Sequence, residues 1–242
     1  MCSSDLTASA LAAATQVYNP ATGKGANRPK ADALSIGGQK NFWLLEYLKL
    51  VGMRYAGLPR VVSGSKDRKT YVLLPKNIKL ATNNKVFRTF QDSFWAYSAI
   101  KMDIMAALKF THIFLDQWQQ GQLSEIDEMF GVQPGDYIQG LAMVFYKDMG
   151  SAHAVLNQSI INLPRWMPQV TTKQEALTFI EVLGEHEAII RNFKEEHSLD
   201  YEMLRSYRDF LSSGKLHDFL AFTGQYSSYL THEFEKKEKY SP

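Results

Sequence analysis

The sequence predicts a mainly α protein, in which a helical bundle follows a small helix-plus-β-hairpin unit and a basic N-terminal loop. Three observations predict this fold. Apolar residues recur at helical spacing over most of the chain after residue 84. A short β-branched run and a turn rich in Gly, Ser and Asp precede that region. Pro, Gly and Asn crowd residues 18–30 and exclude regular structure there. We therefore divide the chain into residues 1–36, 37–83 and 84–242.

Length and composition limit the class of protein. A chain of 242 residues with 45% hydrophobic residues can bury a sizeable core. Its single cysteine, Cys2, excludes a disulfide framework and a cysteine-rich zinc site, and it fits a reducing compartment. The first 15 residues lack the basic start of a signal peptide, and no apolar run of about 18 residues is present. We therefore expect a cytoplasmic protein with no membrane contact.

Charge is distributed unevenly along the chain. Residues 1–90 contain 14 Lys and Arg against four acids, whereas residues 91–242 contain 13 against 21. Such segregation predicts a nucleic acid or another acidic surface as partner of the basic part. The alternative is a basic segment that neutralises the acidic part of the same chain.

The N-terminal segment contains three cations, Lys24, Arg28 and Lys30, with no acid nearby. Its Gly-Lys-Gly is not a P-loop, because the GxxxxGK[ST] spacing is absent and no apolar strand precedes it. We expect either a flexible basic loop or a loop that becomes ordered on a polynucleotide backbone.

A helix is predicted next, over Gln39–Val51. Phe42, Leu45 and Leu48 form an apolar face at helical spacing, and Gly52 fits the position just past the end of the helix.

A basic β-hairpin follows this helix. Strands are predicted at Pro59–Ser63 and Arg68–Leu74, joined by the turn Gly64–Asp67, and Pro75 cannot continue a central strand. The turn carries one acid, Asp67, among several cations. Cations at a hairpin tip suit phosphate better than a folded core. The predicted phosphate contacts are Lys66, Arg68 and Lys69, with Arg60, Lys24, Arg28 and Lys30 next.

The remainder is predicted to be helical. A long stripe of apolar residues, with a break inside, indicates the first helix, and Thr172 to Glu175 matches a capping box that begins a later one. Asn83 or Asn84 is predicted to cap the first helix, and Ser198 and Gly214 to bound another. The predicted helices are 85–120, 124–130, 136–149, 152–163, 172–197, 199–213 and 215–237.

The sequence contains no recognisable catalytic constellation. His186-Glu187 begins like HExxH, but Ile190 stands where the second histidine is needed. Neighbouring acids such as Glu195 and Glu196 do not face each other on a helix and indicate a solvated face. We expect no enzyme activity, no metal, no cofactor and no small-molecule substrate.

Aromatic residues interleave with the basic ones, and such rings can stack on bases. Trp43 and Tyr47 are predicted to belong to the core, and the role of Tyr71 is left open between core and stacking. The remaining tryptophans, Trp95, Trp118 and Trp166, are predicted to lie in the bundle core or on a docking surface.

Several segments occur in an order that resembles a known family. These are NPATGKGANRPK, FWLLEYLKLVG, KDRKTYVLLP and, near the end, YRDFLSSGKLHDFLAFTGQYSSYL. Together they resemble the C-terminal half of the large subunit of type I CRISPR Cascade complexes, including the region equivalent to the small subunit. The resemblance covers residues 17–80 and 200–235 best. A full large subunit is longer, so the chain is expected to be a split or internally initiated product.

The resemblance implies a function. It implies a non-catalytic subunit of an RNA-guided antiviral complex, which contacts guide RNA, target DNA and the other Cascade protein subunits. In such complexes base pairing reads the sequence, and the protein supplies charge and shape. The alternative from another class is a helical scaffold that binds only proteins.

Overall fold

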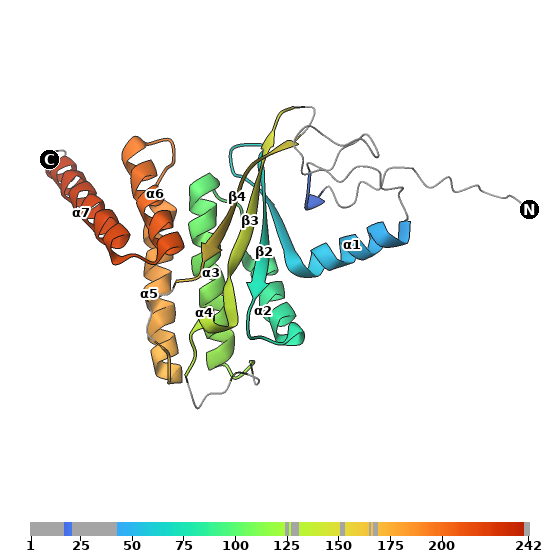
Figure 1. Ribbon diagram of the computed structural model, residues 1–242. Helices are drawn as coiled ribbons and strands as arrows, with labels where there is room; N and C mark the ends of the chain where they lie inside the picture. Colours follow the sequence, from blue (N-terminus) through green and yellow to red (C-terminus); the bar gives the residue numbers. More distant parts are fainter. Residues whose placement is uncertain are drawn as a thin grey trace, which may run out of the picture. The chain divides into compact units, whose positions relative to one another are not determined.

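The computed structural model shows a mainly α protein with a small sheet, which confirms the predicted fold class in its coarse form. Its described part contains seven helices and a four-stranded antiparallel sheet (Figure 1). The predicted N-terminal loop and the predicted helix at 124–130 lie mostly outside this part. The structure describes residues 17–20, 43–123, 126, 131–150, 153–164, 166 and 169–239.

The chain forms two compact units. The first unit comprises Met1–Val61, Ser65–Val72 and Met143–Ser159. The second unit comprises Val62–Gly64, Leu73–Ala142 and Ile160–Pro242.

The sheet has the strand order β1-β2-β3-β4. β1 and β2 occur where the hairpin was predicted and pair antiparallel, with Gly57 opposite Val72 and Val61 opposite Arg68. β2 begins at the predicted residue, whereas β1 begins two residues before the predicted Pro59. The strands are β1 (Gly57–Val61), β2 (Arg68–Pro75), β3 (Ile138–Asp148) and β4 (His153–Asn162).

The prediction of two helices at 136–149 and 152–163 is wrong, because most of these residues form β3 and β4. Short apolar runs fit both periods, and in β3 the buried residues on both faces hide the alternation of a strand. At Gly140 the backbone lies close to that of Ile161, because an added Cβ would lie 2.4 Å from the carbonyl oxygen of Ile161. Only glycine permits so close an approach of two backbones. The predicted helical bundle over 84–242 is therefore interrupted by two strands.

In the first unit, α1 (Trp43–Ala56) runs through Gly52, where the helix was predicted to end. The helix stops where β1 begins, at Gly57. An added Cβ at Gly57 would lie 3.1 Å from the Tyr18 ring. The hydroxyl of Thr70 donates a 2.6 Å hydrogen bond to the carbonyl oxygen of Tyr18. These contacts attach residues 17–20 to the first unit.

In the second unit, the predicted long helix is two helices, α2 (Leu80–Ser93) and α3 (Ala99–Gln119), separated by residues 94–98. The prediction of a break is therefore confirmed. The predicted caps are wrong, because Asn83 and Asn84 lie inside α2 and its N-cap is Lys79. Most side chains of α3 are buried, which makes it the central helix of this unit. A short helix, α4 (Pro134–Tyr137), precedes β3.

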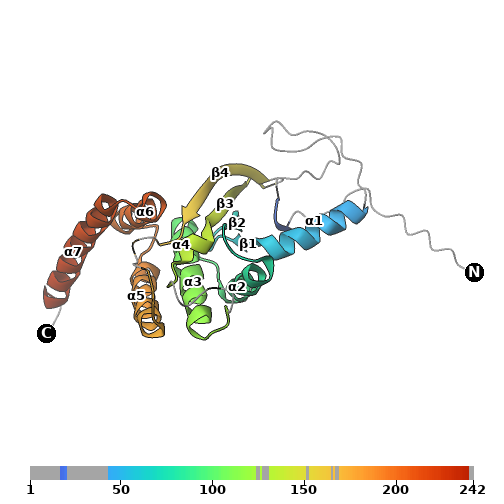
Figure 2. The same ribbon diagram turned by 60° about the horizontal axis from the view of Figure 1, so that its bottom comes forward.

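The helices α5 (Lys173–Asn192), α6 (Ser198–Ser213) and α7 (Leu216–Lys239) complete the second unit. α3 packs against α5, and α6 packs against α7 (Figure 2). The capping box is confirmed: the Glu175 N–H donates to Thr172 Oγ1 at 3.1 Å, and the Thr172 N–H donates to Glu175 Oε2 at 3.2 Å. Gly214 ends α6 with φ 66°, as predicted, but the N-cap is His197 rather than Ser198.

Candidate nucleic-acid interface

The predicted phosphate contacts in the hairpin lie in the first unit, on β1, on β2 and in the hairpin tip, which we define as residues 65–68. Lys66 is exposed and Arg68 is half-buried. Within the described part of the chain, neither side chain makes a hydrogen bond or ion pair. Both cationic groups are therefore available to a ligand.

The acid of the hairpin tip, Asp67, is turned away from solvent. Its Oδ1 accepts a 2.9 Å hydrogen bond from the Asp148 N–H, and its Oδ2 accepts a 3.0 Å bond from Lys147 Nζ on β3. Burial raises the pKa of Asp67, but the bonds from Asp148 and Lys147 outweigh it and hold the pKa below its ordinary value. The Asp67 carboxylate is therefore ionised at neutral pH, and its charge is neutralised by Lys147 rather than by the tip cations.

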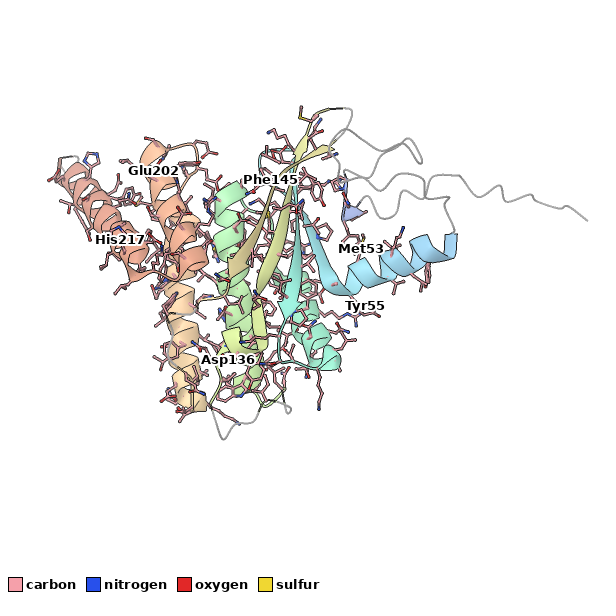
Figure 3. The ribbon with its side chains drawn as sticks, viewed as in Figure 1. Met53, Tyr55, Asp136, Phe145, Glu202 and His217 are labelled. Atoms are coloured by element: carbon pink, nitrogen blue, oxygen red, sulfur yellow. The ribbon has the colours of Figure 1, made fainter. Side chains whose placement is uncertain are left out.

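Lys69 has a different environment from Lys66 and Arg68. Its residue is only 3% exposed, and its Nζ lies 5.2 Å from the centre of the Phe145 ring. Phe145 lies on β3 (Figure 3). A cation over an aromatic face is stabilised by the ring quadrupole. Lys69 therefore belongs to the interior of the sheet, in a position that a phosphate cannot reach without rearrangement.

Arg60 stands directly opposite Lys69 in the β1–β2 pairing. Its Nη1 donates a 3.1 Å hydrogen bond to the Pro59 carbonyl, and its side chain is half-buried. Like charges directly opposite each other destabilise an antiparallel pair. The Phe145 ring offsets part of this cost at Lys69. The other predicted contacts, Lys24, Arg28 and Lys30, lie outside the described residues.

A second set of cations lies in the second unit, on α2 and just before it. Residues 76–91 contain four cations and no acid. All four residues are exposed, and Lys85 Nζ also donates a 3.2 Å hydrogen bond to the Gln122 carbonyl. These cations were not among the predicted site residues. The signal that could have identified them is the absence of any acid over these 16 residues. They are Lys76, Lys79, Lys85 and Arg88.

The aromatic residues do not all lie where they were predicted. Tyr71, whose role was left open, is fully buried and belongs to the core, as does Trp118. Tyr47 was predicted to be core but is exposed on α1, as is Tyr55. Trp95, predicted to lie in the core or on a docking surface, is highly exposed.

Two of the histidines, His186 and His112, are held in structural contacts. His186 stacks on Trp166 with ring centres 5.1 Å apart, and its Nδ1 lies 2.7 Å from the hydroxyl of Tyr207. Burial lowers the pKa of His186, so its ring is neutral at physiological pH. His112 Nδ1 lies 3.4 Å from the buried carboxylate of Glu187. Among the residues that the structure describes, no three potential ligands are grouped to hold a metal ion.

Comparisons with protein-family models, with curated proteins and with solved structures give no match to this chain. No helix in the described ranges has the length and apolar character needed to cross a membrane. The interpretation of the site therefore depends on its own geometry and charge.

Proposed function

We propose that this chain is a non-catalytic nucleic-acid-binding subunit that holds a polynucleotide backbone through Lys66 and Arg68. One observation carries the proposal. The hairpin tip has a single acid, Asp67, and that acid is buried and neutralised by Lys147, so the tip presents only positive charge to solvent. A positive tip on a paired, hydrogen-bonded support matches the phosphate contacts that position a nucleic acid without reading its sequence.

The charge of the first unit supports the same proposal. Its three segments contain 11 Lys and Arg against five acids, whereas the second unit has an excess of acids. Lys69 and Arg60 add to the positive potential behind the tip even though Lys69 is buried. Electrostatic attraction of this kind supplies most of the sequence-independent affinity for nucleic acids and decreases with salt.

The assembly that we propose for this subunit is an RNA-guided complex of the type I CRISPR Cascade kind, with guide RNA, target DNA and other Cascade proteins as partners. The resemblance of the N-terminal loop, the hairpin and the C-terminal helices to the large subunit of these complexes supports it. Backbone contacts by the hairpin tip fit a complex in which base pairing reads the sequence.

The test is the double variant Lys66→Ala with Arg68→Ala, measured by fluorescence anisotropy with a labelled single-stranded RNA. We expect weaker binding to every sequence, and a log–log salt slope reduced by about 0.7 for each lost phosphate contact between about 50 and 200 mM salt. A matched control is Lys194→Ala with Lys215→Ala, which removes two exposed cations of the second unit. Equal affinity of the tip variant and the wild type at every salt concentration would refute the proposal.

A helical scaffold that binds only proteins is the second candidate. The observation that favours it is the outer side of α7, where Leu216, Leu220 and Phe234 are exposed. The absorbance ratio at 260 and 280 nm of the purified protein, with and without nuclease, separates the two candidates, because only a nucleic-acid-binding protein carries nuclease-sensitive absorbance at 260 nm.

A further inference from the structure

Trp95 is exposed to an unusual degree for a tryptophan. It lies in the connection between α2 and α3 and is 72% exposed, whereas Trp118 on α3 is 2% exposed. Tryptophan is highly buried on average, so an exposed large aromatic side chain is more informative than a buried one. The indole of Trp95 is therefore available to a partner.

The backbone that carries Trp95 is fixed on both sides. The Phe94 N–H donates a 2.9 Å hydrogen bond to the Phe90 carbonyl, and the buried Phe94 ring lies 5.0 Å from the Phe90 ring. On the other side, the Tyr97 carbonyl accepts a 2.9 Å bond from the Ser63 N–H, and the Tyr97 ring lies 5.9 Å from the Phe94 ring. Phe94 and Tyr97 hold the chain inward, so Trp95 is presented outward by a rigid support. Such preorganisation reduces the cost of ordering a contact when a ligand binds.

Cations precede Trp95 along α2. Lys85 and Arg88 are exposed and three residues apart, so they are neighbours on one helical face. Arg88 lies five residues before the end of α2 at Ser93, about 8 Å of helical rise, and Trp95 follows two residues after that end. Asp92, also exposed, is the one acid in the sequence between residues 76 and 95. The segment that leads to Trp95 therefore carries a net positive charge and is followed by an exposed aromatic residue.

We propose that Trp95 is a stacking platform for an unpaired base of single-stranded nucleic acid, with Lys85 and Arg88 contacting the flanking phosphates. This inference rests on the proposed function and adds the ligand class, single-stranded nucleic acid. An indole can stack on a base only where that base is not enclosed in a duplex. Aromatic rings in a cationic groove are the usual means of binding single strands without sequence preference. A protein partner could also use the tryptophan and the arginine, which are enriched at protein interfaces, but the lysines beside them are depleted there.

The test compares the full-length wild type with Trp95→Ala, Trp95→Phe and Lys85→Ala/Arg88→Ala. The ligands are an oligouridine of about 12 nucleotides and an RNA duplex of equal length. We expect Trp95→Ala to weaken oligouridine binding about tenfold, and Trp95→Phe, which keeps an aromatic face, to weaken it much less. Oligouridine should quench the tryptophan fluorescence of the wild type, and Trp95→Phe should remove most of that quenching. Duplex binding should not respond to Trp95→Ala. Circular dichroism confirms that each variant is folded.

The outcomes separate this inference from the proposed function. If Trp95→Ala binds oligouridine like the wild type while the Lys66/Arg68 variant is weakened, the stacking site is wrong, the hairpin stands, and the exposed indole is left to a protein partner. If Trp95→Ala is weakened and the Lys66/Arg68 variant is not, the stacking site stands and the hairpin is wrong. A wild type that binds neither ligand refutes both.

Discussion

Asp67 is expected to stabilise the first unit through a charge-assisted pair of hydrogen bonds. The Asp148 N–H at 2.9 Å and Lys147 Nζ at 3.0 Å both donate to its buried carboxylate. A hydrogen bond to a charged group contributes about 1.5–3 kcal/mol, whereas an ion pair with a half-exposed lysine contributes about 0.2–1 kcal/mol. Asp67→Asn keeps one acceptor oxygen, so we expect a loss of about 1–2 kcal/mol. Asp67→Ala keeps none and should cost about 2–4 kcal/mol.

The pH dependence of this stabilisation has a defined sign. The pKa of Asp67 is lower in the folded protein than the value of about 3.9 in an unfolded chain. The contribution of the carboxylate is therefore fully present above about pH 5 and is lost as the pH falls through 4 toward the folded pKa. Asp67→Asn lacks this titration, so the difference in stability between wild type and variant should shrink in acid.

Urea unfolding at several pH values, followed by circular dichroism, measures both effects. Asp136→Asn, which changes an exposed carboxyl on α4, serves as the control and should alter stability little (Figure 3). A loss below about 0.5 kcal/mol for Asp67→Asn, or a difference that does not change with pH, would show that Asp67 is not held as described.

Two further predictions concern the second unit. Gly140→Ala places a methyl group 2.4 Å from the carbonyl oxygen of Ile161, which is backbone and cannot move aside cheaply, so thermal unfolding should show a loss of about 2 kcal/mol or more; an unchanged Tm would contradict the close approach of β3 and β4. Thr172→Ala removes one half of the capping box and should lower stability by about 1 kcal/mol. Thr172→Ser should restore it, and a loss common to both variants would argue against capping.

The helices of the C-terminal part were predictable because they carry explicit boundary signals. Thr172 and Glu175 form a capping box, and Gly214 adopts the left-handed conformation that ends a helix. β3 and β4 carried no comparable signal, because their apolar residues fit a helical period as well as a strand. The decisive feature at Gly140 is a contact with Ile161, which lies 21 residues further along the chain. Sequence spacing does not reveal such a contact.

The candidate site was predictable only in part. The cations of the hairpin were identified, but strand alternation places Lys69 and Tyr71 on the same face of β2, and both are buried. From the sequence alone, that alternation could have shown that Lys69, unlike Lys66 and Arg68, lies on the buried face. The exposure of Trp95 depends on Phe94 and Tyr97, which turn inward and leave the two residues between them outside. Whether Trp95 is exposed therefore depends on where α2 ends, and the continuous apolar stripe of the sequence conceals that end.

The interleaving of the two units along the chain has a practical consequence for dissecting the protein. The polypeptide passes from one unit to the other five times, at 61–62, 64–65, 72–73, 142–143 and 159–160. No single cut yields either unit intact. A fragment that starts at residue 84, where the predicted helical bundle begins, would lack β1 and β2 and leave β3 with an unpaired edge. Unpaired edges promote aggregation, so loss of binding in a truncated protein would report misfolding rather than the position of the binding residues.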